Sequence, residues 1–313
     1  MNVSNIIRIG TRDSQLALWQ ANRVKDLLKL QGYQCELVPT KSEGDIDLVT
    51  PLYAMGVEGV FTKTLDAYLL SNKIDMAVHS MKDVPTQLAQ GITQAAVLER
   101  GNVNDVLIMN HKVSIENEKD SIFNFQFSIG TGSVRRKAQW LHRYRNTQFE
   151  NLRGNVQTRL RKLNESNWHG IIMAQAGLER MDLLPENYQL LDWMLPAPAQ
   201  GAIMVVCRED DKGLFEKIHK LNHEPTALCT KIERDFLKTL MGGCSTPISA
   251  LAEIKNGTLY FKGNILSPDG KEKKEIEKKV NLSSADELGV LAAKELLGAG
   301  AGKIVEAIRN KAN

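Results

Sequence analysis

The stretch IDMAVHSMKDVP, residues 74–85, changes abruptly from apolar to charged. Its first part, IDMAVHS, has the apolar run of a buried β-strand, and the charged pair Lys82 and Asp83 follows directly, just before Pro85. In open α/β sheets, ligands bind beyond the carboxyl ends of the strands. The stretch therefore predicts a sheet and also a functional position at the end of one of its strands.

Strand-like and helix-like segments alternate on the amino-terminal side of this stretch. Strands are predicted at 6–10 and 35–40, and helices at 14–30 and 62–70. The first of these helices carries one apolar stripe, and Asp13 or Ser14 is its predicted N-cap. Such alternation predicts a largely parallel α/β sheet.

A second α/β unit and then a different kind of domain are predicted downstream. The second unit has predicted strands at 105–110, 127–133, 147–152 and 170–177, with helices from 133 to 145 and over 156–163. Another strand, 203–208, and a helix starting near Asp210 follow the segment LPAPAQGA. The last third has a helix at 226–240, strands with turns at KNG and PDG, a charged run at 271–279 and a helical stretch at 285–309. This mixture predicts a separate α+β domain, with the charged run as a solvated face.

The composition limits the classes of protein to which the chain can belong. With 313 residues, 42% hydrophobic and 25% charged, it has the composition of a soluble protein of two or three domains. A net charge of +3 gives no global case for binding nucleic acid or membranes. Because no apolar run is long enough to span a membrane or serve as a signal segment, we predict a cytoplasmic protein. The four cysteines form no CxxC pair, so no metal site is predicted.

Basic residues are densest between positions 135 and 162. Four of them are predicted to face solvent: Lys137, Arg143, Arg161 and Lys162. Arg135 and Arg136 differ because they open a helix directly after the turn GTGS, where unpaired backbone N–H groups and the helix dipole favour an anion. Arg153 and Arg159 frame LRGNVQTR in the same strand-to-helix manner. Guanidinium groups in such places bind carboxylate or phosphate bidentately.

Two further residues each have a structural and a functional interpretation. Cys244 lies in LMGGCSTPIS, and its residue type alone favours a buried, structural thiol. The two preceding glycines and Pro247 instead favour a loop that presents the sulfur to a cleft. Asp83 is either a turn residue bonded to its own backbone or a functional carboxylate at a strand end.

Seven separated motifs resemble one family, the porphobilinogen deaminases, also called hydroxymethylbilane synthases. In order they are RIGTRDSQLALWQ, HSMKDVP, GTGSVRR, LRGNVQTRL, AGLER, LPAPAQGA and GGCSTPI, and they run from about residue 6 to beyond 250. The resemblance implies two α/β domains like those of hinged periplasmic binding proteins, with a smaller C-terminal α+β domain. The implied boundaries are 1–101 plus 199–221 for domain 1, 102–198 for domain 2 and 222–313 for domain 3.

The resemblance also implies an activity and a covalent cofactor. Enzymes of this family are transferases that condense four porphobilinogen molecules head to tail, with loss of ammonia, into the linear tetrapyrrole hydroxymethylbilane of the haem pathway. They build it on a dipyrromethane primer, which the match places in a thioether bond to Cys244. The thiolate would form that bond by attacking the electrophilic carbon left by deamination.

The family's functional residues carry over by motif. Asp83 matches the catalytic aspartate, which would stabilise cationic pyrrole species and assist proton transfer. The cofactor is expected to contact Asp83 together with Lys82, Ser133, Arg135 and Arg136. The substrate is expected to contact Arg12, Ser14, Arg153, Arg159, Arg180 and the hinge-proximal Gln200. A monomer that binds neither metal, nucleic acid nor membrane is implied.

The chain departs from the family pattern at four positions. Family members commonly carry lysines where this chain has Ala54 and Glu58, within a predicted lid at 41–59. A serine is common where Gly132 stands, and an acidic residue where Met241 stands. We expect activity to be retained with altered lid behaviour.

Two other classes of protein remain as alternatives. A non-catalytic binding protein for a small polycarboxylate would use the same two-lobed fold, but it would need no covalent anchor at Cys244. A nucleic-acid-binding protein would rest on the arginine stretch, where Trp140 and Tyr144 are the aromatic residues that could serve as stacking platforms. Covalent attachment of the ligand distinguishes the enzyme from both.

Overall fold

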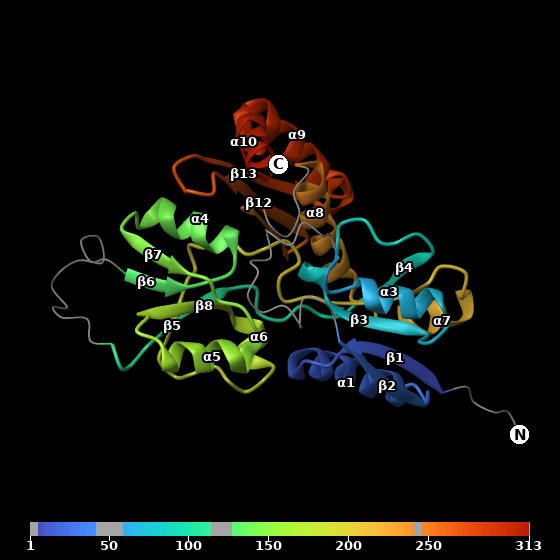
Figure 1. Ribbon diagram of the computed structural model, residues 1–313. Coiled ribbons are helices and arrows are strands. Elements are labelled where there is room, and N and C mark those ends of the chain that lie inside the picture. Colours follow the sequence, from blue (N-terminus) through green and yellow to red (C-terminus); the bar gives the residue numbers. More distant parts are fainter. Residues whose placement is uncertain (1–5, 42–58, 114–126, 241–245, 313) are drawn as a thin grey trace, which may run out of the picture. The chain divides into compact units, whose positions relative to one another are not determined.

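The computed structural model describes residues 6–41, 59–113, 127–240 and 246–312 (Figure 1). The chain divides into two compact units. It passes from unit 1 to unit 2 after Gly101, returns after Gln200, and leaves unit 1 again after Leu228. Each unit has a five-stranded sheet of its own, and unit 2 also contains a three-stranded sheet.

The sheet of unit 1 has the strand order β2-β1-β3-β10-β4. Its strands are β1 (Ile7–Arg12), β2 (Cys35–Thr40), β3 (Met76–Ser80), β4 (Ile92–Val97) and β10 (Ile203–Arg208). β1 is parallel to β2 and β3, whereas β10 is antiparallel to both β3 and β4. β10 runs antiparallel because the returning chain enters at the edge where β3 ends, with Ile203 opposite Ser80. The sheet is therefore mixed rather than largely parallel, and sequence analysis missed β4.

Helices cover both faces of this first sheet. They are α1 (Gln15–Leu30), α3 (Lys63–Leu70) and α7 (Lys212–His219), with a short 3₁₀ turn, η2 (Met81–Asp83). Ser14 caps α1 by accepting a hydrogen bond from the Ala17 N–H, which settles the predicted N-cap. Buried side chains of α1 and α7 share one core with Ile9 and Val78. Leu65 of α3 packs against β1 at Gly10, where a Cβ would collide with Ile74.

The first sheet of unit 2 repeats the same arrangement, in the order β7-β6-β8-β5-β9. Its strands are β5 (Asp105–Met109), β6 (Phe127–Gly130), β7 (Thr147–Glu150), β8 (Gly170–Ala174) and β9 (Tyr188–Leu190). β6 is parallel to β7 and β8, and the entering strand β5 is antiparallel to its neighbours β8 and β9. Helices α4 (Val134–Arg143) and α5 (Val156–Glu165) lie on opposite sides of this sheet, as Figure 1 shows. The strand predicted at 170–177 ends early and becomes the short helix α6 (Gln175–Glu179).

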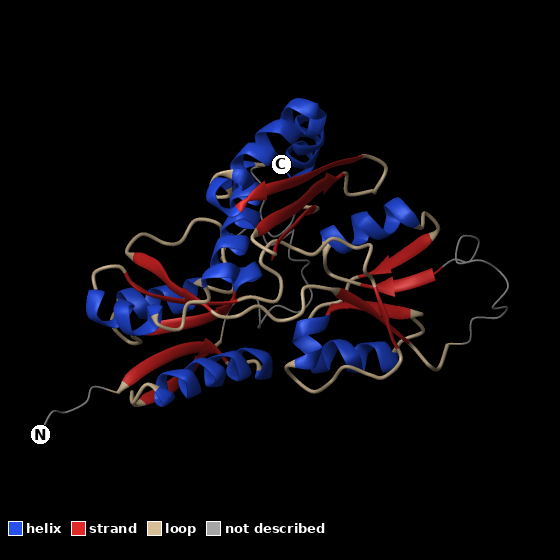
Figure 2. Ribbon diagram, turned by 180° about the vertical axis from the view of Figure 1, so that it is seen from behind, coloured by secondary structure: helices blue, strands red, loops and turns tan. Residues whose placement is uncertain are grey.

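The rest of unit 2 is a smaller domain around an antiparallel sheet (Figure 2). Its strands are β11 (Ile248–Lys255), β12 (Thr258–Leu266) and β13 (Lys273–Asn281). Its helices are α8 (Glu224–Thr239), whose residues up to Leu228 belong to unit 1, α9 (Leu288–Leu296) and α10 (Gly302–Ala312), with short turns η3 (Leu282–Ser284) and η4 (Leu297–Ala301). Phe236 of α8 packs on this sheet at Gly263, where a Cβ would meet its ring at 2.6 Å. Gly300, with φ of 98°, breaks the single helix predicted over 285–309. The charged run at 271–279 falls largely on the edge strand β13, with Ile276 buried.

These elements confirm the predicted fold class. The chain is mixed α/β, with two sheet-and-helix domains and a smaller C-terminal domain that has a three-stranded sheet. The three sets of domain boundaries given above remain a prediction, because the contacts group residues 102–200 with the C-terminal domain in one unit. Within the described parts of the chain, no helix has the length and apolarity that a membrane span requires.

Candidate functional site

Predicted site residues of unit 1 gather at one edge of its sheet. Arg12 ends β1, and the turn that carries Lys82 and Asp83 directly follows β3. Because β1 and β3 are parallel neighbours, their carboxyl ends meet at the same edge. This is the edge at which open α/β sheets bind ligands.

Arg12 and Ser14 are held by local contacts at this edge. The guanidinium carbon of Arg12 lies 4.2 Å from the ring centre of Phe61, a cation–π arrangement that orients a half-buried cation. The Ser14 hydroxyl oxygen accepts the 3.4 Å capping bond from Ala17. Its hydroxyl hydrogen can still donate to a carboxylate.

Asp83 is presented by a turn whose backbone is fixed on both sides. Met81 and Val84 are buried, the Met81 N–H donates to the Ala202 carbonyl at 3.0 Å, and the Val84 N–H donates to the Met81 carbonyl at 3.2 Å. Asp83 itself is half-buried. An Asx turn would need a backbone N–H two residues later, and that position is Pro85, which has none. Asp83 therefore cannot form an Asx turn, which was its structural interpretation.

A buried amide supports the same turn from α1. Gln20, which is 1% exposed, donates from Nε2 to the Ser80 hydroxyl at 2.9 Å. Ser80 ends β3 and immediately precedes the turn. Sequence analysis missed Gln20, because its place on the inner side of α1 becomes clear only when α1 packs against β3.

The burial of His79 predicts that the stability of unit 1 depends on pH. Burial, followed by the charge of Arg12, lowers the pKa of His79 to about 4. In the unfolded chain this histidine titrates near its ordinary value of about 6.5, so the unfolded state binds more protons between these two values. The free energy of unfolding should therefore fall by about 3 kcal/mol as the pH drops from about 6.5 to about 4.

Urea unfolding at several pH values between 4 and 7 measures this loss. His79→Gln should flatten the profile over this window, because it removes the group that must be protonated on unfolding. His111→Gln, a change at an exposed position, is the matched control and should leave the profile unchanged. An unaltered slope in His79→Gln would contradict the assignment.

The predicted site residues of unit 2 also gather at the carboxyl edge of a sheet. Ser133, Arg135 and Arg136 follow β6, while Arg153 follows β7 and Arg180 follows β8 and α6. These three strands are parallel, so their ends share one edge. Sequence analysis placed arginines at two strand-to-helix turns, and the topology puts both turns at one edge of the sheet.

The turn between β6 and α4 depends on a close backbone approach. Ser133 caps α4 by accepting a hydrogen bond from the Arg136 N–H at 3.4 Å. A Cβ at Gly132 would lie 2.8 Å from the Leu152 carbonyl oxygen. A serine at this position, as the resemblance leads one to expect, would force the backbone leading into Arg153 to shift.

Arg135 and Arg136 share a carboxylate that sequence analysis missed. Arg135 Nη2 lies 2.6 Å from Asp105 Oδ2, and Arg136 binds Asp105 Oδ1 through Nε at 3.1 Å and Nη2 at 2.8 Å. All three residues are at most 5% exposed. Burial alone would raise the pKa of Asp105, but the two guanidinium groups hold it well below its usual range.

Gln200 belongs to the same cluster. Its Nε2 donates to Asp105 Oδ1 at 3.0 Å and to the Val103 carbonyl at 2.8 Å. Gln200 is fully buried. It therefore joins the segment that enters unit 2 to the segment that leaves it.

The other arginines of unit 2 differ in their surroundings. Arg153 is 3% exposed, and Arg159 is half-buried, with Nε donating to the Gly154 carbonyl at 2.7 Å. Burial lowers the pKa of the Arg180 guanidinium, which ends α6. The predicted solvent-facing residues Lys137, Arg143 and Arg161 are exposed, and Lys162 is half-buried.

Helix α4 is also bonded to the strand that follows the cysteine motif. The Gln139 side chain donates to the Ser249 hydroxyl of β11 at 3.0 Å and to the Leu195 carbonyl at 2.9 Å, and it accepts from the Leu195 N–H at 2.9 Å. β11 begins four residues after Cys244 in the sequence. The arginine-bearing helix and this strand therefore belong to one bonded assembly within unit 2.

Cys244 itself lies outside the described residues, as do Ala54, Glu58 and Met241. The other three cysteines are Cys35, which is half-buried, and Cys207 and Cys229, which are buried. Burial raises the pKa of the Cys207 thiol to about 11. A thiol in that environment is a poor nucleophile at neutral pH.

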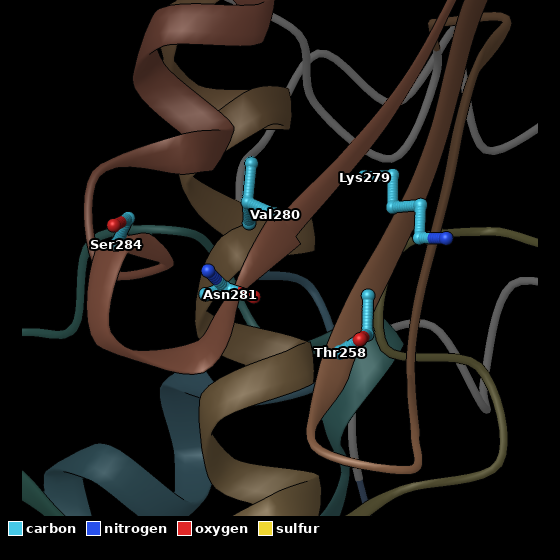
Figure 3. Close-up of a pocket in the computed structure, with 5 residues that line it drawn as sticks. All are labelled: Thr258, Lys279, Val280, Asn281 and Ser284. Carbon is cyan, nitrogen blue, oxygen red and sulfur yellow. The ribbon is translucent and has the colours of Figure 1, made fainter.

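A hollow in the C-terminal domain is separate from the predicted site residues. It has a volume of about 410 Å³ and opens beside β13, where Figure 3 shows the side chains that line it. The lining residues are Thr258, Lys279, Val280, Asn281 and Ser284. Since this lining includes none of the predicted site residues, we do not assign it to the site.

Comparison with known families gives two matches. Residues 7–216 match the family model described as porphobilinogen deaminase, dipyromethane cofactor binding domain, and residues 227–298 match that family's C-terminal domain. The chain belongs to the porphobilinogen deaminase family. The first match contains every described site residue predicted above, whereas Cys244 falls in the second.

Relatives resemble the chain over nearly its whole length. A probable porphobilinogen deaminase of Methanocaldococcus jannaschii is 43% identical over 92% of this chain and 98% of its own. A porphobilinogen deaminase of Francisella tularensis is 40% identical over 96% and 99%, and one of Syntrophomonas wolfei is 39% identical over 96% and 97%. Enzymes of this family are transferases, and dipyrromethane is the cofactor of the domain matched by residues 7–216.

Solved structures of other kinds overlap the chain only loosely. The Bordetella pertussis BvgS periplasmic VFT2 domain has a TM-score of 0.41 at 11% identity, covering 70% of this chain and 87% of its own. A substrate-binding protein of an amino acid ABC transporter has a TM-score of 0.35 at 12% identity, covering 69% and 91%.

Proposed function

We propose that the chain is a transferase that condenses four porphobilinogen molecules head to tail, releasing ammonia at each addition, to form hydroxymethylbilane. One observation carries the proposal. The region that matches the family's cofactor-binding domain places basic side chains and Asp83 at the carboxyl edges of its two sheets. These are the positions at which an α/β sheet binds a ligand.

The residues of unit 2 fit a ligand that bears several carboxylates. Porphobilinogen carries an acetate and a propionate, so a dipyrromethane built from it carries four carboxylates. The edge offers the guanidinium groups of Arg135, Arg136, Arg153, Arg159 and Arg180. Guanidinium groups bind carboxylates through paired hydrogen bonds, and partial burial strengthens such bonds. Arg153 and the Arg135–Arg136 pair are the most buried and would bind the cofactor or substrate most firmly.

The residues of unit 1 would supply the chemical step. Loss of ammonia and coupling of pyrroles both create positive charge on the pyrrole ring. The carboxylate of Asp83, on its fixed turn, would stabilise that charge and accept or return a proton. Arg12 would hold a substrate carboxylate beside it, and the Ser14 hydroxyl would donate to the same group. Lys82 would hold a carboxylate of the cofactor.

Cys244 would anchor the dipyrromethane through a thioether. When bound, this group supplies the free pyrrole end to which substrate units are added. The other three cysteines are at least half-buried in the fold, and the GGC motif is the one cysteine position with an open backbone on its amino side. This contrast supports Cys244 as the anchor.

Incubation of the purified chain with porphobilinogen tests the function. One ammonia should be released for each porphobilinogen consumed, and the product mass should equal that of a hydroxylated linear tetrapyrrole. Binding of porphobilinogen without consumption would instead favour a polycarboxylate-binding protein.

The cytoplasmic location, the monomeric state and the lack of nucleic-acid binding are further parts of the proposal, and they rest on the family resemblance and the near-neutral charge. Sedimentation of the holoenzyme would test the oligomeric state.

A further inference from the structure

The cluster around Asp105 lies where the chain enters unit 2. Asp105 is the first residue of β5 and is fully buried. β5 runs antiparallel to β8, so its start lies at the edge where β6 and β8 end, with Asp105 opposite Ala174. A carboxylate here is placed by the topology beside the first turn of α4.

Both oxygens of Asp105 are occupied by cationic or polar donors. Oδ2 accepts from Arg135, while Oδ1 accepts from Arg136 and from Gln200. The same guanidinium groups make a second contact each, Arg135 Nη1 with the Leu195 carbonyl at 2.8 Å and Arg136 Nη1 with the Ile172 carbonyl at 2.9 Å. The position of each guanidinium plane is therefore set from two sides.

Among the described residues, the charges of this cluster do not balance. Two guanidinium groups lie side by side on one carboxylate, so the three groups together carry one net positive charge. Burying unmatched charge is costly, and two adjacent cations repel each other in a medium of low polarity. A ligand carboxylate beside this edge would neutralise the remaining positive charge. Before the ligand binds, Asp105 keeps the two arginines together.

We propose that Asp105 is a positioning residue that sets the geometry of Arg135 and Arg136 for carboxylate binding. Gln200 ties Asp105 to the two segments by which the chain enters and leaves unit 2, because its amide donates hydrogen bonds to both Asp105 and the Val103 carbonyl. The inference rests on the proposed function, and it assigns to Asp105 a role that acts through the arginines rather than on the substrate.

Unit 1 offers a matched control cluster. Asp75 likewise lies between two arginines, with Arg8 Nη2 at 2.7 Å and Arg208 Nη2 at 3.7 Å. It directly precedes β3, so it lies at the amino edge of its sheet, opposite the edge that carries Asp83. Arg208 also pairs with Asp211 at 3.4 Å, so this more exposed cluster is balanced in charge. Asp75→Asn therefore removes the same charge from an arginine–carboxylate cluster that lies away from the candidate site.

The experiment compares Asp105→Asn, Asp75→Asn and the wild-type holoenzyme. Three quantities are measured: the melting temperature, the fraction of protein carrying the cofactor mass, and the KM and kcat for porphobilinogen. Both variants should melt at lower temperature. Asp105→Asn alone should raise the KM by about tenfold or more, as expected when charge-assisted hydrogen bonds to a substrate are misplaced, and should lower the cofactor-bearing fraction.

A merely structural role for Asp105 predicts a different result. The variant would then lose thermal stability, as Asp75→Asn does, while keeping full cofactor loading and a normal KM, and the inference would be overturned. If Asp105→Asn does not fold, Asp105→Glu decides, because it keeps the charge but displaces it by one methylene. A raised KM in that variant supports positioning, and a wild-type KM overturns it. Wild-type protein with neither cofactor mass nor turnover would refute the proposed function itself.

Discussion

Asp83→Asn should lower kcat by about 10²–10⁴-fold, the usual contribution of a positioned acid–base group, while the protein keeps its covalent cofactor. The substitution preserves the shape of the side chain and removes its charge, so the turn between Met81 and Val84 should stay in place. Positive charge developing on the pyrrole ring would then lack its counter-charge. Steady-state kinetics, combined with the intact mass of the denatured protein, measure the two effects separately.

Asp13→Asn is the matched control for this experiment. Asp13 is an exposed carboxylate one residue after β1, at the same edge of the sheet as Asp83. Its loss changes the net charge by the same amount and should leave kcat within about twofold, because surface substitutions rarely alter the site. A near-normal kcat in Asp83→Asn would remove this carboxylate from the mechanism. An equal loss in both variants would point to a general electrostatic effect.

Cys244→Ser should abolish turnover and leave the bare polypeptide mass. The wild-type chain should be heavier by two linked porphobilinogen-derived units, because a thioether survives denaturation. A serine hydroxyl is a much weaker nucleophile than a thiolate and should not form the corresponding bond at neutral pH. Intact-mass measurement after incubation with porphobilinogen gives the answer directly.

Cys35→Ser controls for the loss of any thiol. Cys35 is half-buried at the start of β2, and burial raises the pKa of its thiol, so it should not react with the substrate. This variant should keep both the added mass and the activity. If the wild type has the bare mass under all conditions, the cysteine is not an anchor, and a polycarboxylate-binding protein becomes the better interpretation.

Much of the local structure could be predicted from the sequence. The β2 bounds were predicted correctly, and Ser14 is one of the two N-caps predicted for α1, because a short strand and a helix start are signalled by adjacent residues. The helix predicted at 285–309 was wrong at Gly300, whose left-handed φ interrupts it. Strand β4 was missed, since a short strand between loops gives a weak periodic signal.

The candidate site, like the fold, could be predicted only in part from the sequence. The sequence by itself determined which strand ends carry Arg12, Asp83 and Arg135, because each follows an apolar run within a few residues, and its motifs indicated the family. Only the tertiary structure decided that Asp105 pairs with Arg135, thirty residues away, and that Gln20 supports Ser80, sixty residues away. An acidic residue at the head of an apolar strand shows no partner in its own neighbourhood of sequence. Asp105 meets its arginine partners because β5 runs antiparallel and starts at the edge where the parallel strands β6 and β8 end. That arrangement arises from packing over the whole unit.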